Sequence, residues 1–209
     1  PPICENRVLV TSVEGSTDLG ALKKTNKLGM IAVQAIQLVR IVHERGFVHG
    51  DIHMKQFVLD LAHPSTSLRL LDFGRAVPYL TDSGAHVPEK KVKAEMNWNS
   101  SLLSVFELEN FPKTRRDDFF RLAEMFLRKL PKGDSVIIKA MQKVKEEFKE
   151  DKPTQRLKIL KMKTNRSFAD NVPEIFKLFY TYTLGLAHDE RPDYEGWIDQ
   201  FNKYAHNVV

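Results

Sequence analysis

The amino-acid sequence predicts a mainly α-helical domain of the α+β class, in which a helical bundle carries one small β-hairpin. Three observations lead to this prediction. Most of the chain shows apolar residues at helical spacing, two short β-rich runs lie close together, and no internal repeat or flexible linker divides the sequence. The chain has 209 residues, of which 42% are hydrophobic and 28% charged, so we expect a packed core and not a disordered protein.

The first predicted elements are a strand, a short helix and a long buried helix. Residues 7–13 are rich in β-branched side chains and end at a Glu-Gly-Ser turn, which indicates a strand. Residues 18–24 favour a short helix. Residues 28–45 are apolar on nearly all sides, with one narrow polar stripe, which is typical of a helix in the middle of a domain. Gly46 follows this helix as an expected C-terminal cap.

The rest of the chain is predicted to contain the hairpin, an irregular segment and more helices. Two short apolar runs, residues 57–61 and 68–71, are joined by a connection with Pro and Ser, which indicates a β-hairpin. Between residues 74 and 114 the periodicity weakens, so we expect a long irregular segment. Four helices should follow, at residues 117–130, 135–148, 171–186 and 194–204.

The net charge of +5 is concentrated in one part of the chain. The segment from Lys139 to Lys163 contains nine Lys and Arg residues and four acidic residues, so its net charge of +5 equals that of the whole chain. Such a segment could attract nucleic acid, acidic proteins or anionic membrane surfaces. The alternative is that the segment is a solvated helical face followed by a basic loop. In that case residues 156–163, in which basic and apolar side chains alternate, form the solvated edge of the loop.

Several classes of protein are excluded or disfavoured. The single cysteine, Cys4, excludes an intrachain disulfide framework and a cysteine-based zinc site. The longest nearly apolar stretch, residues 30–42, is too short and too polar to cross a membrane, so we expect no transmembrane segment. We expect a cytoplasmic or nuclear location. His49 and His53 have helical i, i+4 spacing but no glutamate between them, which argues against a zinc site.

Two aspartates are candidates for chemistry. Asp51 lies in a loop after the predicted buried helix, and Asp72 lies at the end of the predicted hairpin. Two carboxylates that a fold brings together can bind a divalent metal, or one of them can act as a base. Each aspartate taken alone could equally be a turn or cap residue.

The residues around these aspartates resemble the C-terminal lobe of a eukaryotic protein kinase. His49-Gly50-Asp51 is similar to the catalytic-loop motif, and Asp72-Phe73-Gly74 is similar to the metal-binding motif. The sequences Arg-Arg-Asp-Asp at 115–118 and Asp-Glu-Arg-Pro-Asp-Tyr at 189–194 resemble the casein kinase 1 and vaccinia-related kinase group. The resemblance covers residues 7–205. It implies a last N-lobe strand and hinge at residues 1–16 and a kinase-like C-terminal lobe at residues 17–209.

The resemblance implies roles for particular residues. Asp51 would be the base that accepts the proton of a substrate hydroxyl, and Asp72 would hold the Mg²⁺ ion that bridges the phosphates of ATP. His49 and Phe73 would be the two C-lobe members of a hydrophobic spine, and Gly74 completes the metal-binding motif. Asp118 would hold the catalytic loop by its backbone. The nucleotide-binding hinge would be Thr11, Ser12, Val13 and Glu14.

Five positions depart from the family pattern. His53 stands where active relatives carry a catalytic lysine, and an imidazole is shorter and mostly neutral at pH 7. Gln56 replaces the second metal-binding residue, an asparagine, so that the second metal site is in doubt. Lys55 could restore the missing positive charge. Trp98-Asn99 replaces a Gly-Thr pair, and Gly50 replaces a phosphate-binding arginine, so we expect no control by phosphorylation of the activation segment.

The sequence lacks the motifs of a kinase N-lobe, which are a glycine-rich loop, a strand lysine and a helix glutamate. Either the chain belongs to a longer protein, which we favour, or a partner covers an apolar cleft that begins at Phe73. Three functions follow: transfer of phosphate from ATP to protein Ser or Thr hydroxyls if an N-lobe is present, a pseudokinase scaffold, or a basic adaptor for nucleic acid. Of these, the resemblance favours the enzyme, a protein serine/threonine kinase, over a degenerate kinase or pseudokinase. The expected partner is a protein, acidic or phosphorylated, and nucleic acid is the less favoured choice.

Overall fold

The computed structural model describes residues 15–16, 25–60, 67–93, 102–130 and 135–207. The predicted strand at 7–13, the short helix at 18–24, the hinge residues Thr11 to Glu14 and the pair Trp98-Asn99 lie outside these ranges. The described helices are α1 (Thr25–Glu44), α2 (Val105–Leu108), α3 (Arg115–Lys129), α4 (Ser135–Glu147), α5 (Lys152–Thr164), α6 (Glu174–Gly185) and α7 (Tyr194–Asn207).

The strands are short and form two small antiparallel sheets. They are β1 (Gly15–Ser16), β2 (Phe47–Val48), β3 (Phe57–Asp60), β4 (Leu68–Leu70) and β5 (Val77–Pro78). One sheet has the order β1-β3-β4, and the other pairs β2 with β5. The predictions of a mainly helical chain and of a hairpin at residues 57–71 are confirmed, and Phe57 of β3 pairs opposite Leu70 of β4. The second sheet, which pairs β2 with β5, was not predicted.

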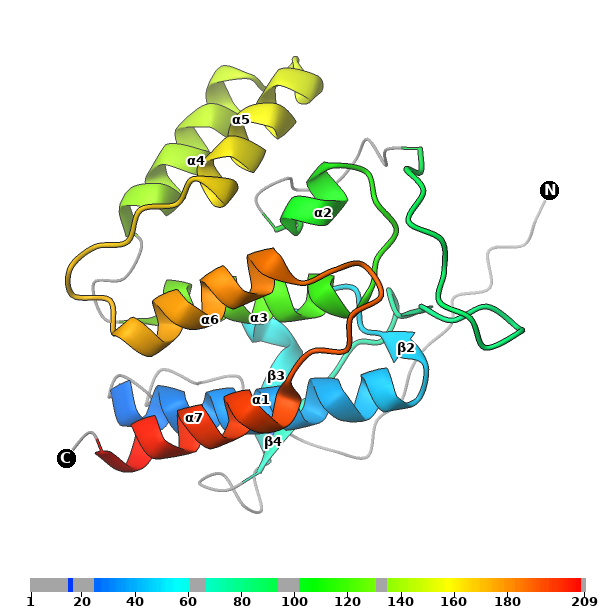
Figure 1. Ribbon diagram of the computed structural model, residues 1–209. Coiled ribbons are helices and arrows are strands. Elements are labelled where there is room, and N and C mark those ends of the chain that lie inside the picture. Colours follow the sequence, from blue (N-terminus) through cyan, green and yellow to red (C-terminus); the bar gives the residue numbers. More distant parts are fainter. Residues whose placement is uncertain (1–14, 17–24, 61–66, 94–101, 131–134, 208–209) are drawn as a thin grey trace.

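Helix α1 is the centre of the helical core, as predicted. Its Ala32, Ala35, Ile36 and Val39 are fully buried, and α7 lies along it on one side (Figure 1). The two helices approach closely at Gly29, where a Cβ atom would lie 3.0 Å from a ring carbon of Tyr204.

A second helical layer lies over the pair of α1 and α7, with α3 packed on α1 and α6 packed on α7 (Figure 1). It consists of α3 and α6, whose fully buried phenylalanines stack edge to face, while the α4–α5 pair stands at the opposite end of the molecule from α7 (Figure 1). Gly46 ends α1 with φ +83°, and its N–H bonds the carbonyl of His43 at 3.0 Å, so the predicted cap is confirmed.

The prediction that residues 156–163 form a solvated loop edge is wrong. They belong to α5, which begins after Asp151, whose carboxylate accepts a hydrogen bond of 3.1 Å from the N–H of Thr154. Ile159 and Lys163 are fully buried. The helical period is hard to recognise in the sequence because one of its buried positions is a lysine, and only a partner from another helix makes burial of that charge possible.

Candidate functional site

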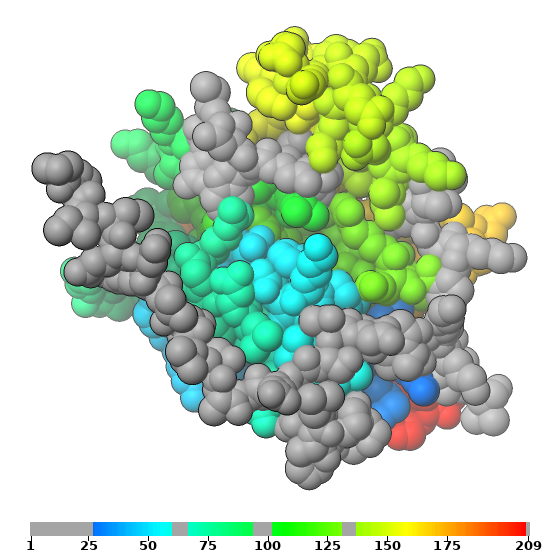
Figure 2. Space-filling model, turned by 180° about the vertical axis from the view of Figure 1, so that it is seen from behind, coloured from blue at the N-terminus to red at the C-terminus, as the bar shows by residue number. Residues whose placement is uncertain are grey.

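Asp51 and Asp72 face the same amide group. The Nε2 atom of Gln56 lies 3.4 Å from Oδ2 of Asp51 and 3.4 Å from Oδ2 of Asp72. The hairpin explains this arrangement, because pairing of β3 with β4 brings the residues before β3 beside those after β4. The N–H of Leu71 also donates to the carbonyl oxygen of Gln56 at 2.8 Å. Figure 2 shows the face on which these two segments, around residues 50–60 and 70–80, lie next to each other.

The loop that carries Asp51 is held by Asp118. This buried carboxylate, in the first turn of α3, accepts hydrogen bonds from the N–H groups of His49 (2.6 Å) and Gly50 (2.9 Å). Its Oδ2 also lies 3.0 Å from Nε2 of His43. Burial by itself raises the pKa of Asp118, but the bonds to His43 and to the loop outweigh it and hold the pKa below the ordinary value. Asp118 therefore stays charged and anchors the loop.

Gly50 is the only residue type that fits its position without strain. Its φ is +71°, and a Cβ atom there would lie 2.6 Å from the carbonyl oxygen of Arg75. The side chain of Lys113 passes on the same side, with its Nζ 3.3 Å from that Cβ position. This geometry accounts for the glycine at position 50.

His49 and Phe73 lie against each other, with their ring centroids 5.0 Å apart. The His49 side chain is tied down by a contact of 2.9 Å between Nε2 and the carbonyl oxygen of Leu71. Phe73 is 50% exposed, so one side of its ring faces solvent. Asp72 has φ 59°, an unusual value for a residue other than glycine, and its Oδ1 accepts from the N–H of Gly74 at 3.2 Å. Strained backbone of this kind is common at functional sites.

The carboxylate of Asp51 has a different set of neighbours at each oxygen. Oδ2 faces Gln56 and, at 3.6 Å, Nε2 of His53. Oδ1 faces Nη1 of Arg121 at 3.2 Å and Nη1 of Arg75 at 3.8 Å. Among the described Lys and Arg residues, these two arginines place a side-chain nitrogen within 4 Å of a carboxylate oxygen of Asp51. Neither arginine was predicted from the sequence. Lys55, which was expected to supply the charge, makes no ion pair with Asp51 among the described residues.

The imidazole of His53 does not supply a positive charge beside Asp51 at pH 7. Burial lowers its pKa, and this effect together with the charge of Arg121 outweighs the opposite effect of Asp51. The imidazole is therefore neutral at pH 7. Its Nδ1 caps the short 3₁₀ turn η2 (Met54–Gln56) by accepting from the N–H of Lys55 at 3.3 Å. Its position beside Asp51 suits a role in packing and polarity more than in charge neutralisation.

The site fits a magnesium ion that brings most of its own ligands. The carboxylate of Asp72 is a hard donor of the kind Mg²⁺ prefers, the amide oxygen of Gln56 is a possible second donor, and Mg²⁺ commonly keeps waters and phosphate oxygens as further ligands. Within the described residues, no group of three or more His, Cys, Asp or Glu side chains could hold a metal ion alone. The Nε2 of Gln56 points at both carboxylates, so a metal there requires the amide to turn its oxygen inward.

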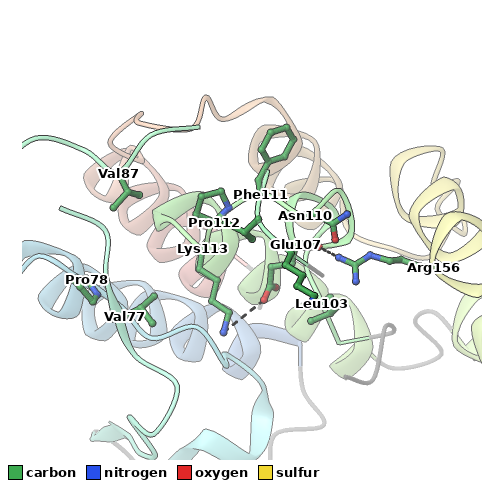
Figure 3. Close-up of a pocket in the computed structure, with 12 residues that line it drawn as sticks. Val77, Pro78, Val87, Leu103, Glu107, Asn110, Phe111, Pro112, Lys113 and Arg156 are labelled. Atoms are coloured by element: carbon green, nitrogen blue, oxygen red, sulfur yellow. Dashed lines mark hydrogen bonds and ion pairs between the residues drawn. The ribbon is translucent and has the colours of Figure 1, made fainter. Parts of the chain in front are cut away.

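The described residues form two pockets in this region, of which the second borders the loop of Asp51. The first, of about 340 Å³, lies between the segment after Asp72 and the residues after α2, and its walls are mainly apolar (Figure 3). Lys113 and Arg156 border it, and Arg156 donates to the carbonyl of Leu108 at 2.8 Å. The second, of about 450 Å³, opens directly beside the loop of Asp51. It is lined by Ile52, His53, Met54, Lys55, Leu102, Arg121, Glu124, Met125, Arg128 and Lys129.

The basic segment between Lys139 and Lys163 is less available to partners than its sequence indicates. Lys163 is fully buried, and its Nζ donates to Glu124 at 2.7 Å and to the carbonyl of Leu103 at 2.5 Å. Arg156 is turned toward backbone carbonyls of α2. Part of the charge excess therefore serves to attach α5 to the domain.

No protein-family model matches this chain. Among the described residues, no helix has the length and apolar character that crossing a membrane requires. The geometry of the Asp51–Asp72 cluster is thus the basis for any statement about function.

Proposed function

We propose that this chain is the C-terminal lobe of a protein-kinase-like enzyme that transfers the γ-phosphoryl group of ATP to Ser or Thr hydroxyls of proteins. One observation carries the proposal. Asp51 and Asp72, which lie in separate motifs, both reach the amide of Gln56, and the backbone of the Asp51 loop is held by the buried Asp118. The resemblance of the motifs to a casein kinase 1 or vaccinia-related kinase supports the same assignment.

In this proposal each residue has one task. When bound, Mg²⁺ and ATP supply the phosphoryl group and neutralise its charge. Asp72 holds the metal through its carboxylate, and the turn at Asp72–Gly74 fixes that carboxylate in direction. Asp51 orients the acceptor hydroxyl and takes its proton, which requires the carboxylate to be fixed at hydrogen-bond distance from the substrate. His49 and Phe73 support the two motifs from behind.

The pocket beside Asp51 suggests an acidic or phosphorylated protein substrate. Lys55, Arg128 and Lys129 line it, and the acid that faces them, Glu124, is already paired with the buried Lys163 at 2.7 Å. The pocket therefore has a net positive field next to the proposed reacting group. A substrate segment with acidic side chains near the acceptor hydroxyl fits this field. We further propose a cytoplasmic or nuclear location, where ATP and such proteins occur.

A pseudokinase scaffold is the second candidate, and the orientation of Gln56 favours it. An amide nitrogen directed at both carboxylates satisfies them without a metal, which a protein that no longer turns over ATP would tolerate. The 50% exposed Phe73 would then form part of a binding surface for another protein.

Transfer of radiolabelled phosphate from ATP by the full-length protein tests the proposal. We expect Mg²⁺-dependent transfer that Asp51→Asn and Asp72→Asn each reduce by at least about 10²-fold, since each removes a group that acts on the reacting atoms. Asp170→Asn, a change at an exposed acid away from the cluster, is the control and should leave the rate unchanged. If wild type binds a protein partner but transfers no phosphate, the scaffold is the better account.

A further inference from the structure

Arg121 is a buried cation to which the proposed reaction assigns no role. It lies on α3, and only 3% of its surface is exposed. Its guanidinium joins two carboxylates that come from different parts of the chain. Nε and Nη2 donate to Glu107 on α2 at 2.7–3.0 Å, and Nη1 donates to Oδ1 of Asp51 at 3.2 Å.

The contact with Glu107 fixes the guanidinium in direction. A bidentate pair between arginine and carboxylate is planar, so it determines where the remaining N–H groups point. Glu107 is itself fixed, because its carboxylate accepts from the N–H of Ser104 at 2.9 Å and its own N–H donates to the hydroxyl of Ser104 at 3.0 Å. Nη1 is thereby directed at Asp51.

Arg121 also stays charged. Burial lowers its pKa, but the charge of Glu107, the bonds to Glu107 and the charges of Asp118 and Asp51 more than offset this and raise the pKa above its ordinary value. Arg75, the other arginine near Asp51, is 46% exposed and 3.8 Å away, so its charge is screened and its direction less defined. Arg121 is therefore the fixed positive charge beside Asp51.

Helix α3 thus holds the loop at two points. Asp118 and Arg121 are three residues apart and lie on adjacent positions of one helix face. Asp118 binds the backbone of the loop, and Arg121 binds the side chain of its aspartate. The two contacts determine both the path of the loop and the direction of the Asp51 carboxylate.

We infer that Arg121 is a positioning residue for Asp51: it compensates the charge of this carboxylate and fixes its orientation from α3, in place of a cation at position 53. The inference rests on the proposed function for its catalytic meaning. The competing explanation is that Arg121 serves only to neutralise Glu107 and thereby attaches α2 to α3. The two explanations differ in which part of the chain loosens when Arg121 is replaced.

The test compares Arg121→Met with Lys163→Met in the full-length protein. Both changes remove a buried cation that pairs with an acid of the same core, but Lys163 pairs with Glu124 and makes no contact with Asp51. We expect amide hydrogen exchange across residues 49–56 to rise at least tenfold in Arg121→Met. In Lys163→Met, faster exchange should be confined to residues near 103 and in α5.

Kinetics give the second measurement. Arg121→Met should lower kcat by about 30-fold or more while the KM for ATP stays within threefold, because in the proposed role the guanidinium acts on Asp51 and not on the nucleotide. Arg121→Lys keeps the charge but cannot make the bidentate contact. Its kcat should be at least about threefold higher than that of Arg121→Met. Lys163→Met should keep wild-type kcat at temperatures where it is folded.

Each outcome decides the inference. If exchange at residues 49–56 is the same in Arg121→Met and Lys163→Met, or if kcat is unaffected in a folded Arg121→Met protein, Arg121 does not position Asp51. Should Arg121→Met fail to fold, Arg121→Lys is measured against Lys163→Met in the same way. A wild-type protein without phosphoryl transfer rejects the proposed function alone, and the exchange of residues 49–56 then decides the positioning role.

Discussion

The carboxylate of Asp118 accepts a hydrogen bond of 2.6 Å from the backbone N–H of His49, a residue 69 positions earlier in the chain. A second bond, from Gly50, reaches its other oxygen. The buried start of α3 and the loop of Asp51 are therefore one rigid unit. The predictions below concern this unit and the surfaces beside it.

Asp118→Asn should destabilise the domain by about 2–4 kcal/mol, because an amide can accept only one of the two loop N–H bonds and turns its NH₂ group toward the other donor. Thermal or urea unfolding measures the loss. Asp199→Asn, at an exposed acid of α7 that pairs with Lys203, is the control and should change stability by less than about 0.5 kcal/mol. Equal effects of the two changes would contradict the anchoring role of Asp118.

The loss of a proton from Asp117 should make the folded domain less stable as the pH rises from about 4 to 7. Burial, helped by the nearby charge of Glu107, raises its pKa from 3.8 to about 7. The folded state then binds a proton that the unfolded state has already lost, so unfolding is favoured progressively across this range. Asp117→Asn keeps hydrogen-bond partners for Thr114 and Ser104 and removes the titration.

Urea unfolding of wild type and Asp117→Asn at pH 5 and pH 8 checks this prediction. The variant should gain stability relative to wild type on going from pH 5 to pH 8. A difference between the two proteins that does not depend on pH would show that Asp117 is not protonated in the folded state.

Gly50→Ala should cost more stability than Gly84→Ala. Both glycines have positive φ, +71° and +80°, so both changes carry a backbone cost of about 1 kcal/mol. Only at Gly50 does the new Cβ atom collide with backbone, 2.6 Å from the carbonyl of Arg75, whereas nothing lies within 4 Å at Gly84. Urea unfolding at neutral pH compares the two variants, and similar losses would refute the collision.

Lys129→Glu should raise the KM for an acidic peptide substrate about three- to tenfold and leave kcat nearly unchanged. The change reverses one exposed charge in the lining of the pocket beside Asp51 and leaves the contacts of the Asp51 carboxylate in place. Lys149→Glu, at an exposed lysine outside this pocket, provides the matched control. The effect should weaken at high salt. An unchanged KM would remove the support for an acidic substrate.

Local patterns in the sequence were enough for much of the fold. The apolar periodicity of residues 28–45 predicted α1, and the two β-rich runs predicted the β3–β4 hairpin. These predictions succeed because each depends on neighbours a few residues apart, whose spacing reflects the burial of one face. The same holds for Gly46, where the cap follows from a residue type that tolerates positive φ.

Helix α5 shows where such patterns fail. Its period contains Lys163 at a buried position, and a lysine in a sequence normally indicates exposure. Only the carboxylate of Glu124, 39 residues earlier, makes the burial acceptable.

The sequence by itself determined the helical class of the domain, its hairpin and the two aspartate motifs, because these depend on residue type and short spacing. The tertiary structure alone decided that Arg121, and not Lys55, lies beside Asp51, and that Lys163 is buried. Both outcomes depend on ion pairs between residues 70 and 39 positions apart. Such pairs form only after helices have packed and excluded water, and no local pattern encodes which charges then meet.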